Sequence, residues 1–163
     1  MKSFDYYLFI DYSENYLGYL IIGKEEIREF LPKISKFAHY RELKHKKAYL
    51  NSIRKIVDKN KVCDHLCKIK IRKTELTPEI YSDILDFIKK NENHLIFISV
   101  DNKQFKNFKK LVNIVDGKNT RVIKESELKK HTPEYKISLV LDTLLNLARL
   151  KNDKTIYQQS FEK

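Results

Sequence analysis

The chain has 163 residues, 42% of them hydrophobic, and its 33 Lys and Arg against 22 Asp and Glu give a formal net charge of +11. This length predicts a single domain whose core needs no disulfide or metal support, and the hydrophobic content excludes an intrinsically disordered chain. No stretch approaches 18 consecutive apolar residues, and the N-terminal segment lacks a signal-peptide pattern. We therefore expect a cytoplasmic protein that does not enter a membrane.

The excess of basic side chains allows two interpretations. A charge of +11 favours an anionic partner, and DNA or RNA is the usual one, because Lys and Arg release counterions from phosphates. Abundant lysine is also typical of heat-adapted proteins, in which it only solvates the surface. Charge alone leaves both interpretations open.

The first 40 residues predict a β-hairpin, followed by a segment whose secondary structure the sequence leaves undecided. Residues 5–11 and 16–22 have the apolar content and alternation of strands, and a short polar turn joins them. Residues 25–37 carry apolar side chains at helical spacing. Pro32 interrupts that spacing, so the segment is either a turn of helix followed by a new start or a short strand.

The next two elements are better defined by their periodicity. Residues 42–58 have the apolar stripe of an amphipathic helix. Residues 66–73 alternate strictly, which predicts a half-buried strand with one apolar and one basic face. The inward positions of this strand are Cys67, Ile69 and Ile71, and the outward positions are Lys68, Lys70 and Arg72.

The second half of the chain alternates between helices and strands. Residues 77–90, 102–115 and 133–150 predict helices, the first of them with Thr and Pro at its start. Residues 94–101 form an apolar run of strand length that we expect to be buried on both faces, and 121–123 predict a short strand. The whole pattern predicts an α/β fold whose sheet starts antiparallel, continues with parallel strands and is flanked by helices.

Four acidic residues stand at positions where carboxylates could meet. Asp11 ends the first strand and Asp101 ends the most buried one, and ligands bind at such strand ends in α/β sheets. Asp142 lies on a polar stripe of the last helix, and Glu42 lies among cations at the start of the helix 42–58. Taken singly, each acid has an ordinary explanation, because turns favour Asp and helices carry solvated acids.

The order of these acids resembles the acidic tetrad of the ribonuclease H-like fold. The chain is most similar to a family of small, mostly uncharacterised ribonuclease H-like proteins. Their members have an Asp-Glu-Ser-Gly strand end, a Glu-Leu-Lys motif, an Asp after a central apolar strand, and a Leu-x-x-Ala-Asp-Leu helix. The corresponding stretches here are FIDYSEN, HYRELKHKK, IFISVDNKQF and LVLDTLLNLA.

The resemblance implies a ribonuclease H-like domain over residues 1–150, followed by a polar tail over 151–163. It also implies Mg²⁺ or Mn²⁺ as cofactor. The implied metal ligands and catalytic residues are Asp11, Glu42, Asp101 and Asp142. Lys44 would contact a phosphate or act as a structural partner, and the lysines of the helix 102–115 would hold the nucleic-acid backbone. These lysines are Lys103, Lys106, Lys109 and Lys110.

Three functions follow from these observations. The first is metal-dependent hydrolysis of a phosphodiester in DNA or RNA, in which the acids hold a divalent ion that activates water. The second is an inactive nucleic-acid-binding or scaffold protein of the same fold, because Tyr12 replaces the family's usual Glu. The third is an oligomeric structural protein. The oligomeric state stays open, with a homodimer as one option.

Overall fold

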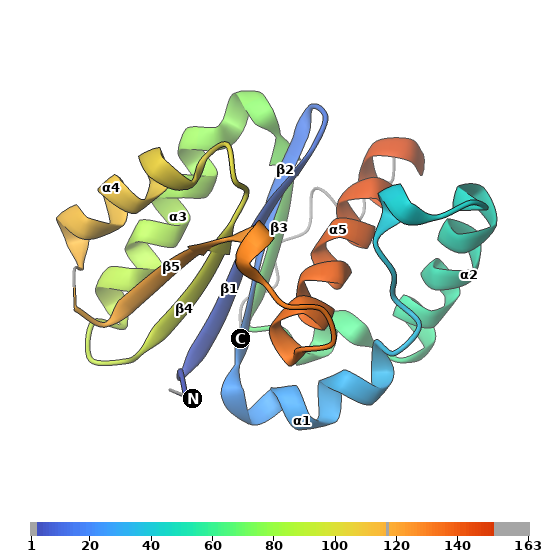
Figure 1. Ribbon diagram of the computed structural model, residues 1–163, viewed down its shortest axis with the longest axis horizontal. Coiled ribbons are helices and arrows are strands. Elements are labelled where there is room, and N and C mark those ends of the chain that lie inside the picture. The colour runs from blue at the N-terminus through green and yellow to red at the C-terminus, as the bar shows by residue number, and fades with distance from the viewer. Residues whose placement is uncertain (1–2, 117, 152–163) are drawn as a thin grey trace.

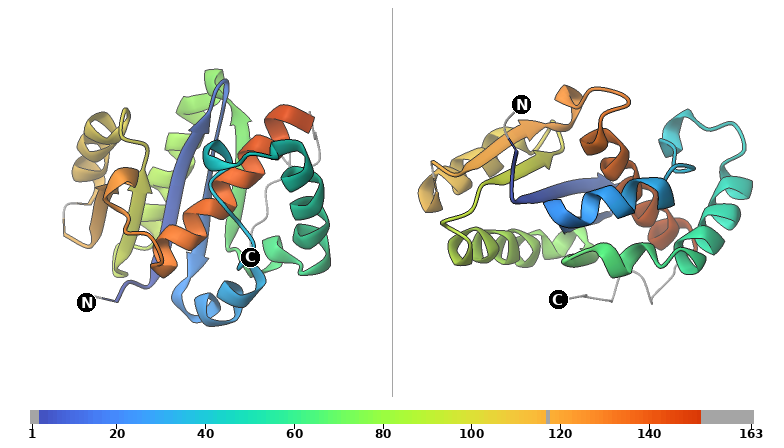
Figure 2. Two further views of the ribbon diagram at one scale, coloured as in Figure 1. Left: turned by 45° about the vertical axis from the view of Figure 1, so that its right-hand side comes forward. Right: turned by 90° about the horizontal axis from the view of Figure 1, so that it is seen from below.

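The protein is described by a computed structural model that covers residues 3–116 and 118–151. A five-stranded sheet forms the middle layer, and helices lie on both of its faces (Figures 1 and 2). The strands are β1 (Tyr6–Ser13), β2 (Tyr16–Gly23), β3 (Lys68–Lys73), β4 (Ile96–Val100) and β5 (Thr120–Lys124). The proposed tail over residues 151–163 lies outside the described residues, apart from the last helical position at 151.

The sheet combines an antiparallel and a parallel half in the order β3-β2-β1-β4-β5. The β1–β2 hairpin and the β2–β3 pair are antiparallel, whereas β1–β4 and β4–β5 are parallel. The predicted α/β class, with its antiparallel start and parallel continuation, is therefore confirmed. Strand β1 is central, so its C-terminal end lies beside the C-terminal end of β4.

The helices begin and end close to the predicted positions, with one exception. They are α1 (Lys24–Lys33), α2 (Lys46–Lys59), α3 (Thr77–Lys90), α4 (Phe105–Val115) and α5 (Pro133–Lys151). Segment 25–37 is mainly helical, and Pro32 is accommodated in the last turn of α1. The predicted helix start at 42 is wrong, because Tyr40–Glu42 forms a separate 3₁₀ turn and α2 begins at Lys46. Backbone bonds hold this turn, in which the Glu42 and Leu43 amides donate to the carbonyls of His39 and Tyr40.

The two faces of the sheet bury separate apolar cores. Helix α5 packs on β1 and β2, with α1 and α2 beside it, and this core includes Phe9, Leu20 and Phe97. Helices α3 and α4 cover the opposite face over a core that includes Leu8 and Ile98. Burial of apolar surface on both faces is what makes β4 wholly buried, as its uninterrupted apolar run predicts.

The basic row of β3 is the main departure from the predicted pattern. Lys70 is only 8% exposed, because α3 covers the face that the alternation assigned to solvent. Its ammonium donates to Asp83 at 2.6 Å and contacts Glu79 at 3.0 Å. Alternation identifies the two faces of a strand, but it does not show that a helix rich in acids covers the polar one. This row is thus neutralised internally and is not a free cationic surface.

Replacing Lys70 by Ala is expected to destabilise the protein by about 2–4 kcal/mol, because loss of one partner leaves charge uncompensated in a half-buried site. Among the described residues, Asp83 would keep the Tyr19 hydroxyl at 3.1 Å and the more distant Lys68 ammonium at 3.9 Å as its side-chain partners. Urea unfolding measures this change. The double variant Lys70→Met/Asp83→Leu should recover most of the loss, and a single variant as stable as the wild type would contradict the prediction.

Candidate functional site

Three carboxylates project from the ends of three neighbouring parallel strands. In the sheet Phe9 of β1 pairs with Ser99 of β4, which pairs with Ile123 of β5. Side chains two residues apart in a strand share a face. The residues two positions after these three paired residues in the sequence are Asp11, Asp101 and Glu125. They lie on the face of the sheet that α5 covers.

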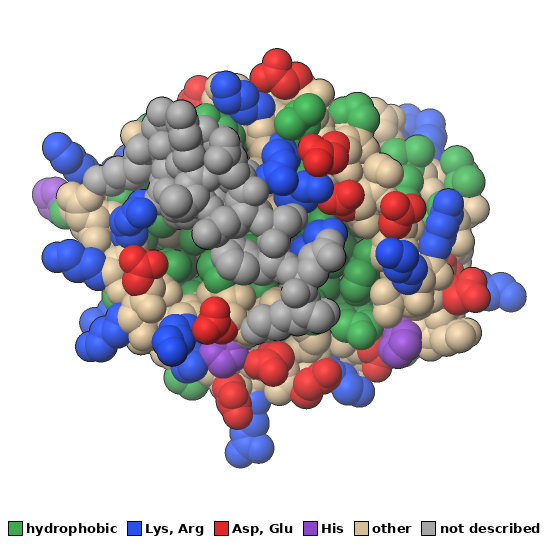
Figure 3. Space-filling model, turned by 180° about the vertical axis from the view of Figure 1, so that it is seen from behind, with side chains coloured by type: hydrophobic (Ala, Val, Ile, Leu, Met, Phe, Trp, Pro, Cys, Tyr) green, Lys and Arg blue, Asp and Glu red, His purple; other side chains and the backbone are tan. Residues whose placement is uncertain are grey.

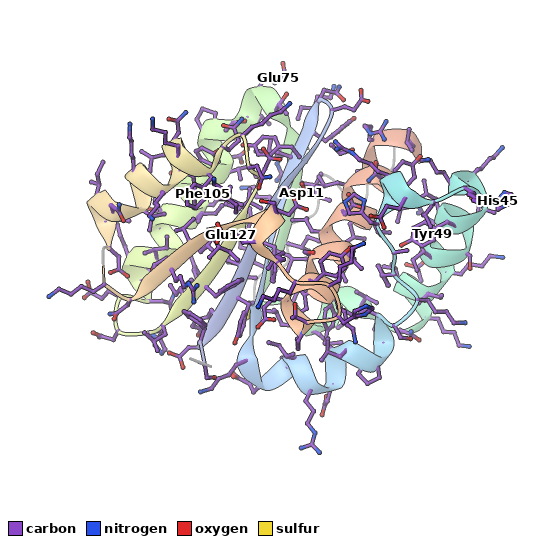
Figure 4. All side chains as sticks on the ribbon, viewed as in Figure 1. Asp11, His45, Tyr49, Glu75, Phe105 and Glu127 are labelled. Atoms are coloured by element: carbon purple, nitrogen blue, oxygen red, sulfur yellow. The ribbon has the colours of Figure 1, made fainter. Side chains whose placement is uncertain are left out.

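One oxygen from each of these three carboxylates can be chosen so that all three lie within 4.8 Å of one another. Asp142 joins them from α5, and all four acids line one cavity of about 340 Å³. The position of Asp11 at the end of β1 is visible in Figure 4. We call Asp11, Asp101, Glu125 and Asp142 the acidic cluster.

Backbone amides hold the acidic cluster in place. One oxygen of Asp11 accepts the Tyr12 amide at 2.8 Å, and one oxygen of Asp101 accepts the Lys103 amide at 3.0 Å. One oxygen of Asp142 accepts the Tyr40 amide at 2.9 Å. Asp11 and Asp101 are therefore each oriented through one oxygen, which leaves the second oxygen for another ligand, whereas the second oxygen of Asp142 accepts a long bond from the Asn146 amide group at 3.5 Å.

Burial and, for the first two, the charge of neighbouring acids disfavour ionisation of Asp11, Glu125 and Asp142. Burial raises the pKa of Asp11 well above its usual range, and the negative charges of Glu125 and Asp142 raise it further. The pKa of Glu125 is raised by burial and by Asp142 and Asp101. Burial also raises the pKa of Asp142, against the Tyr40 amide and nearby cations. A bound cation would remove this repulsion and favour the ionised carboxylates.

The donor set suits a hard divalent cation. Mg²⁺ and Mn²⁺ prefer carboxylate oxygens, and the acidic cluster offers them from four side chains without a competing thiol. Closely spaced, partly desolvated carboxylates are also what a pair of ions about 4 Å apart would require. The residues present thus fit the kind of cofactor that the sequence predicts.

A second group of side chains places basic residues in the lining of the same cavity. His39, Arg41, Lys46 and Arg149 line the same cavity as the acidic cluster. The Lys46 ammonium donates to the Leu43 carbonyl at 2.9 Å and lies 5.6 Å from the centre of the Tyr40 ring. The Nδ1 atom of His39 is buried and has no hydrogen-bond partner among the described residues. Acidic and basic groups therefore face one space.

The structure brings together three of the four acids that the sequence singled out. Asp11, Asp101 and Asp142 line the cavity, but Glu42 does not. The Glu42 side chain is 62% exposed and its carboxylate lies 3.9 Å from the ammonium of Lys130. The 3₁₀ turn presents Arg41 to the cavity instead of Glu42.

Sequence reasoning missed Glu125, although the signal was present. The strand at 121–123 was predicted, and Glu125 follows Ile123 by two residues, as Asp11 follows Phe9. The same alternation that placed Asp11 on the face of Phe9 would have placed Glu125 on the face of Ile123.

The predicted phosphate-contacting lysines lie on both sides of the acidic cluster and outside the cavity lining. Lys44 is exposed between the 3₁₀ turn and α2, and Lys103 is exposed just after Asp101. On α4 the exposed lysines are Lys106, Lys109 and Lys110. The ammonium groups of Lys109 and of Lys124 from β5 each lie 5.5 Å from the centre of the Phe105 ring. On the face seen from behind, basic and acidic side chains are interspersed (Figure 3).

The sheet order and the helical layers define a ribonuclease H-like α/β fold, as predicted. The structure is similar to the crystal structure of the ribonuclease H2 from Pyrococcus horikoshii OT3, with a TM-score of 0.52 and 14% sequence identity. The similarity covers 94% of this chain and 76% of that one. No known family matches the sequence, and no curated protein matches it. Within the described residues, no helix is long and apolar enough to cross a membrane.

Proposed function

We propose that the protein is a divalent-metal-dependent nuclease that hydrolyses a phosphodiester bond of DNA or RNA. One observation carries the proposal: carboxylates from the ends of three adjacent parallel strands converge within 4.8 Å, in a cavity that also has cationic side chains. This combination suits a metal ion and a phosphate together. The nearby cations only partly offset the repulsion among these acids, and a bound metal would offset it further.

Asp11, Asp101 and Glu125 would hold the metal, and Asp142 would complete the site from α5. Bound Mg²⁺ or Mn²⁺ supplies a Lewis acid that stabilises charge on a phosphoryl oxygen and lowers the pKa of water. The Tyr12, Lys103 and Tyr40 amides fix three of the four carboxylates, so little reorganisation is needed when the metal binds.

The choice of nucleic acid as substrate rests on charge. The chain carries +11, and exposed lysines lie on the segment before α2, just after Asp101 and on α4. Lys44, Lys103, Lys106, Lys109 and Lys110 would contact backbone phosphates beyond the cleaved one. Such contacts are independent of sequence and weaken with salt.

The test is a cleavage assay on single-stranded and double-stranded DNA and RNA and on an RNA/DNA hybrid, each with Mg²⁺, Mn²⁺ or EDTA. We expect cleavage of at least one substrate that needs metal and is absent from Asp11→Asn/Asp101→Asn. Equal activity in the double variant would point to a contaminating nuclease and contradict the proposal. Equal circular dichroism spectra establish that the variant is folded.

A second function is supported by the side chain that follows Asp11. Where the resembled family has a Glu, Tyr12 directs its hydroxyl to that of Tyr81, at 2.8 Å. A protein that lacks this acid could bind nucleic acid without cleaving it. That function predicts salt-sensitive binding, no metal-dependent turnover, and loss of binding when Lys106, Lys109 and Lys110 are replaced by Glu.

A further inference from the structure

Arg149 is the most firmly oriented cation of the cavity. It lies on α5 seven residues after Asp142, which is about two helical turns and returns to the same face. Its Nε donates to the Ser13 hydroxyl at 2.9 Å and its Nη2 donates to the Asn146 side-chain carbonyl at 2.8 Å. Two of the five guanidinium N–H groups are thereby used.

The two partners of Arg149 are themselves fixed. The Ser13 hydroxyl donates to the Asn146 side-chain carbonyl at 3.0 Å, which closes a triangle between the last residue of β1 and α5. The Asn146 amide group donates to the backbone carbonyl of Asp142 at 2.8 Å, and Asn146 is only 3% exposed. The side chain of Arg149 is therefore oriented before any ligand binds.

Within the described residues, the Arg149 guanidinium forms no direct ion pair with the acids that share its cavity, although its charge lowers the pKa of Asp142. Among the described residues, no carboxylate lies within ion-pair distance of Arg149, Arg41 or Lys46, and the remaining three N–H groups of Arg149 have no protein partner. An arginine that only tied β1 to α5 would need no cationic neighbours. Instead, Arg149 shares the cavity with two further cations, Arg41 and Lys46, and with the acidic cluster.

The basic side chains of the cavity are suited to bind a phosphodiester. The planar guanidinium matches two phosphate oxygens at once, and Lys46 and Arg41 add positive charge beside it. A divalent ion bound at the acidic cluster would offset the excess negative charge of the carboxylates that line the cavity, so that a polyanion is no longer repelled.

We propose that Arg149 binds a backbone phosphate of the nucleic acid next to the phosphate that is cleaved, and that Ser13 and Asn146 position it for that contact. This inference rests on the proposed function. It assigns Arg149 to substrate binding, Ser13 and Asn146 to positioning, and none of the three to metal coordination.

The test measures binding without cleavage, by fluorescence anisotropy of a labelled oligonucleotide with Ca²⁺ in place of Mg²⁺ across a range of salt concentrations. Arg149→Gln is expected to weaken binding about tenfold, as the loss of one hydrogen-bonded charge contact does. It should also lower the slope of log K against log salt by about 0.7–0.9, the value for one lost phosphate contact. Arg149→Lys should restore the salt slope but only part of the affinity.

Two further variants separate this role from general charge and from stability. Arg28→Gln removes an exposed arginine of α1 outside the cavity and should change binding far less. Ser13→Ala keeps the Arg149 charge but frees its orientation, so affinity should fall while the salt slope stays. Equal effects of Arg149→Gln and Arg28→Gln would overturn the inference and leave the proposed function intact. Absence of wild-type binding to every oligonucleotide would overturn both.

Discussion

Glu125→Gln is expected to lower metal-dependent cleavage at least about 10²-fold, the usual cost of losing one preorganised group that stabilises charge in the transition state. The Glu125 carboxylate lies within 4.8 Å of Asp11 and Asp101, and Gln preserves its size while removing the negative charge that a metal needs. Initial rates at saturating Mg²⁺ or Mn²⁺ measure the effect. The loss should appear chiefly in kcat, because substrate phosphates contact other side chains.

Glu42→Gln is the matched control for that experiment. The sequence favoured Glu42 as the fourth metal ligand, but its side chain is exposed and lies beside Lys130. We expect its substitution to change the cleavage rate less than about twofold, since surface substitutions away from special features rarely matter. A large loss with Glu42→Gln and none with Glu125→Gln would contradict the assignment and restore the tetrad that the resemblance implied.

Asp11→Asn is expected to abolish metal binding and also to raise the melting temperature of the metal-free protein at neutral pH. Burial and like charges raise the pKa of Asp11 in the folded state. Unfolded Asp has a pKa near 3.9, so the folded protein binds more protons above that value, and its stability falls as pH rises through this window. Asn removes the charge but can still accept the Tyr12 amide.

The expected thermal shifts have opposite signs in the two conditions. Without metal, a gain of about 1 kcal/mol would raise the melting temperature by about 2–4 °C for a chain of this size. With metal at 100 times its dissociation constant, the wild type gains about 2.7 kcal/mol and the variant gains nothing. Differential scanning fluorimetry with EDTA and with Mn²⁺ reads both effects.

Asp116→Asn provides a control with the opposite sign. Burial alone would raise the pKa of Asp116, but the Lys118 and Asn119 amides and the Thr120 hydroxyl lower it below its usual value. Its ionised form therefore stabilises the fold, and this stability is lost as pH falls through the folded-state pKa. Asp116→Asn should lower the melting temperature at neutral pH. A rise in both variants would show that the electrostatic explanation of Asp11 is wrong.

The fold could be predicted largely from local patterns. The hairpin, the buried strand β4 and helix α3 followed from alternation, an apolar run and a Thr-Pro start. Each of these signals depends on neighbouring residues in the chain. The secondary structure of segment 25–37 could not be decided from the sequence, because a proline within a helical pattern excludes the helix interior but allows either the last turn of a helix or a strand. Only packing decides between these two structures.

The site could be predicted only where one strand or helix determined it. Asp11 lies in the last part of β1, Asp101 directly follows β4, and Asp142 lies on the polar stripe that the sequence indicated on α5. The alternation along β5 indicated the face on which Glu125 lies, but its proximity to Asp101 depends on β5 lying beside β4 in parallel register, which no local pattern contains. Glu42 was chosen by its motif, but the 3₁₀ turn and the Tyr40–Asp142 bond direct its neighbours into the cavity instead. The basic row of β3 was misjudged for a similar reason, because α3 is distant in sequence.

The parallel register of β1, β4 and β5 has a consequence for how this protein can change over evolution. Deleting one residue within β5 would leave a strand that still pairs, but Glu125 would move to the face covered by α3 and α4. Loops between these elements can lengthen freely, whereas the strands that carry Asp11, Asp101 and Glu125 tolerate substitution but not a change in length. The spacing of each acid from its strand is therefore the constraint that distant relatives must share, even where little other sequence identity survives.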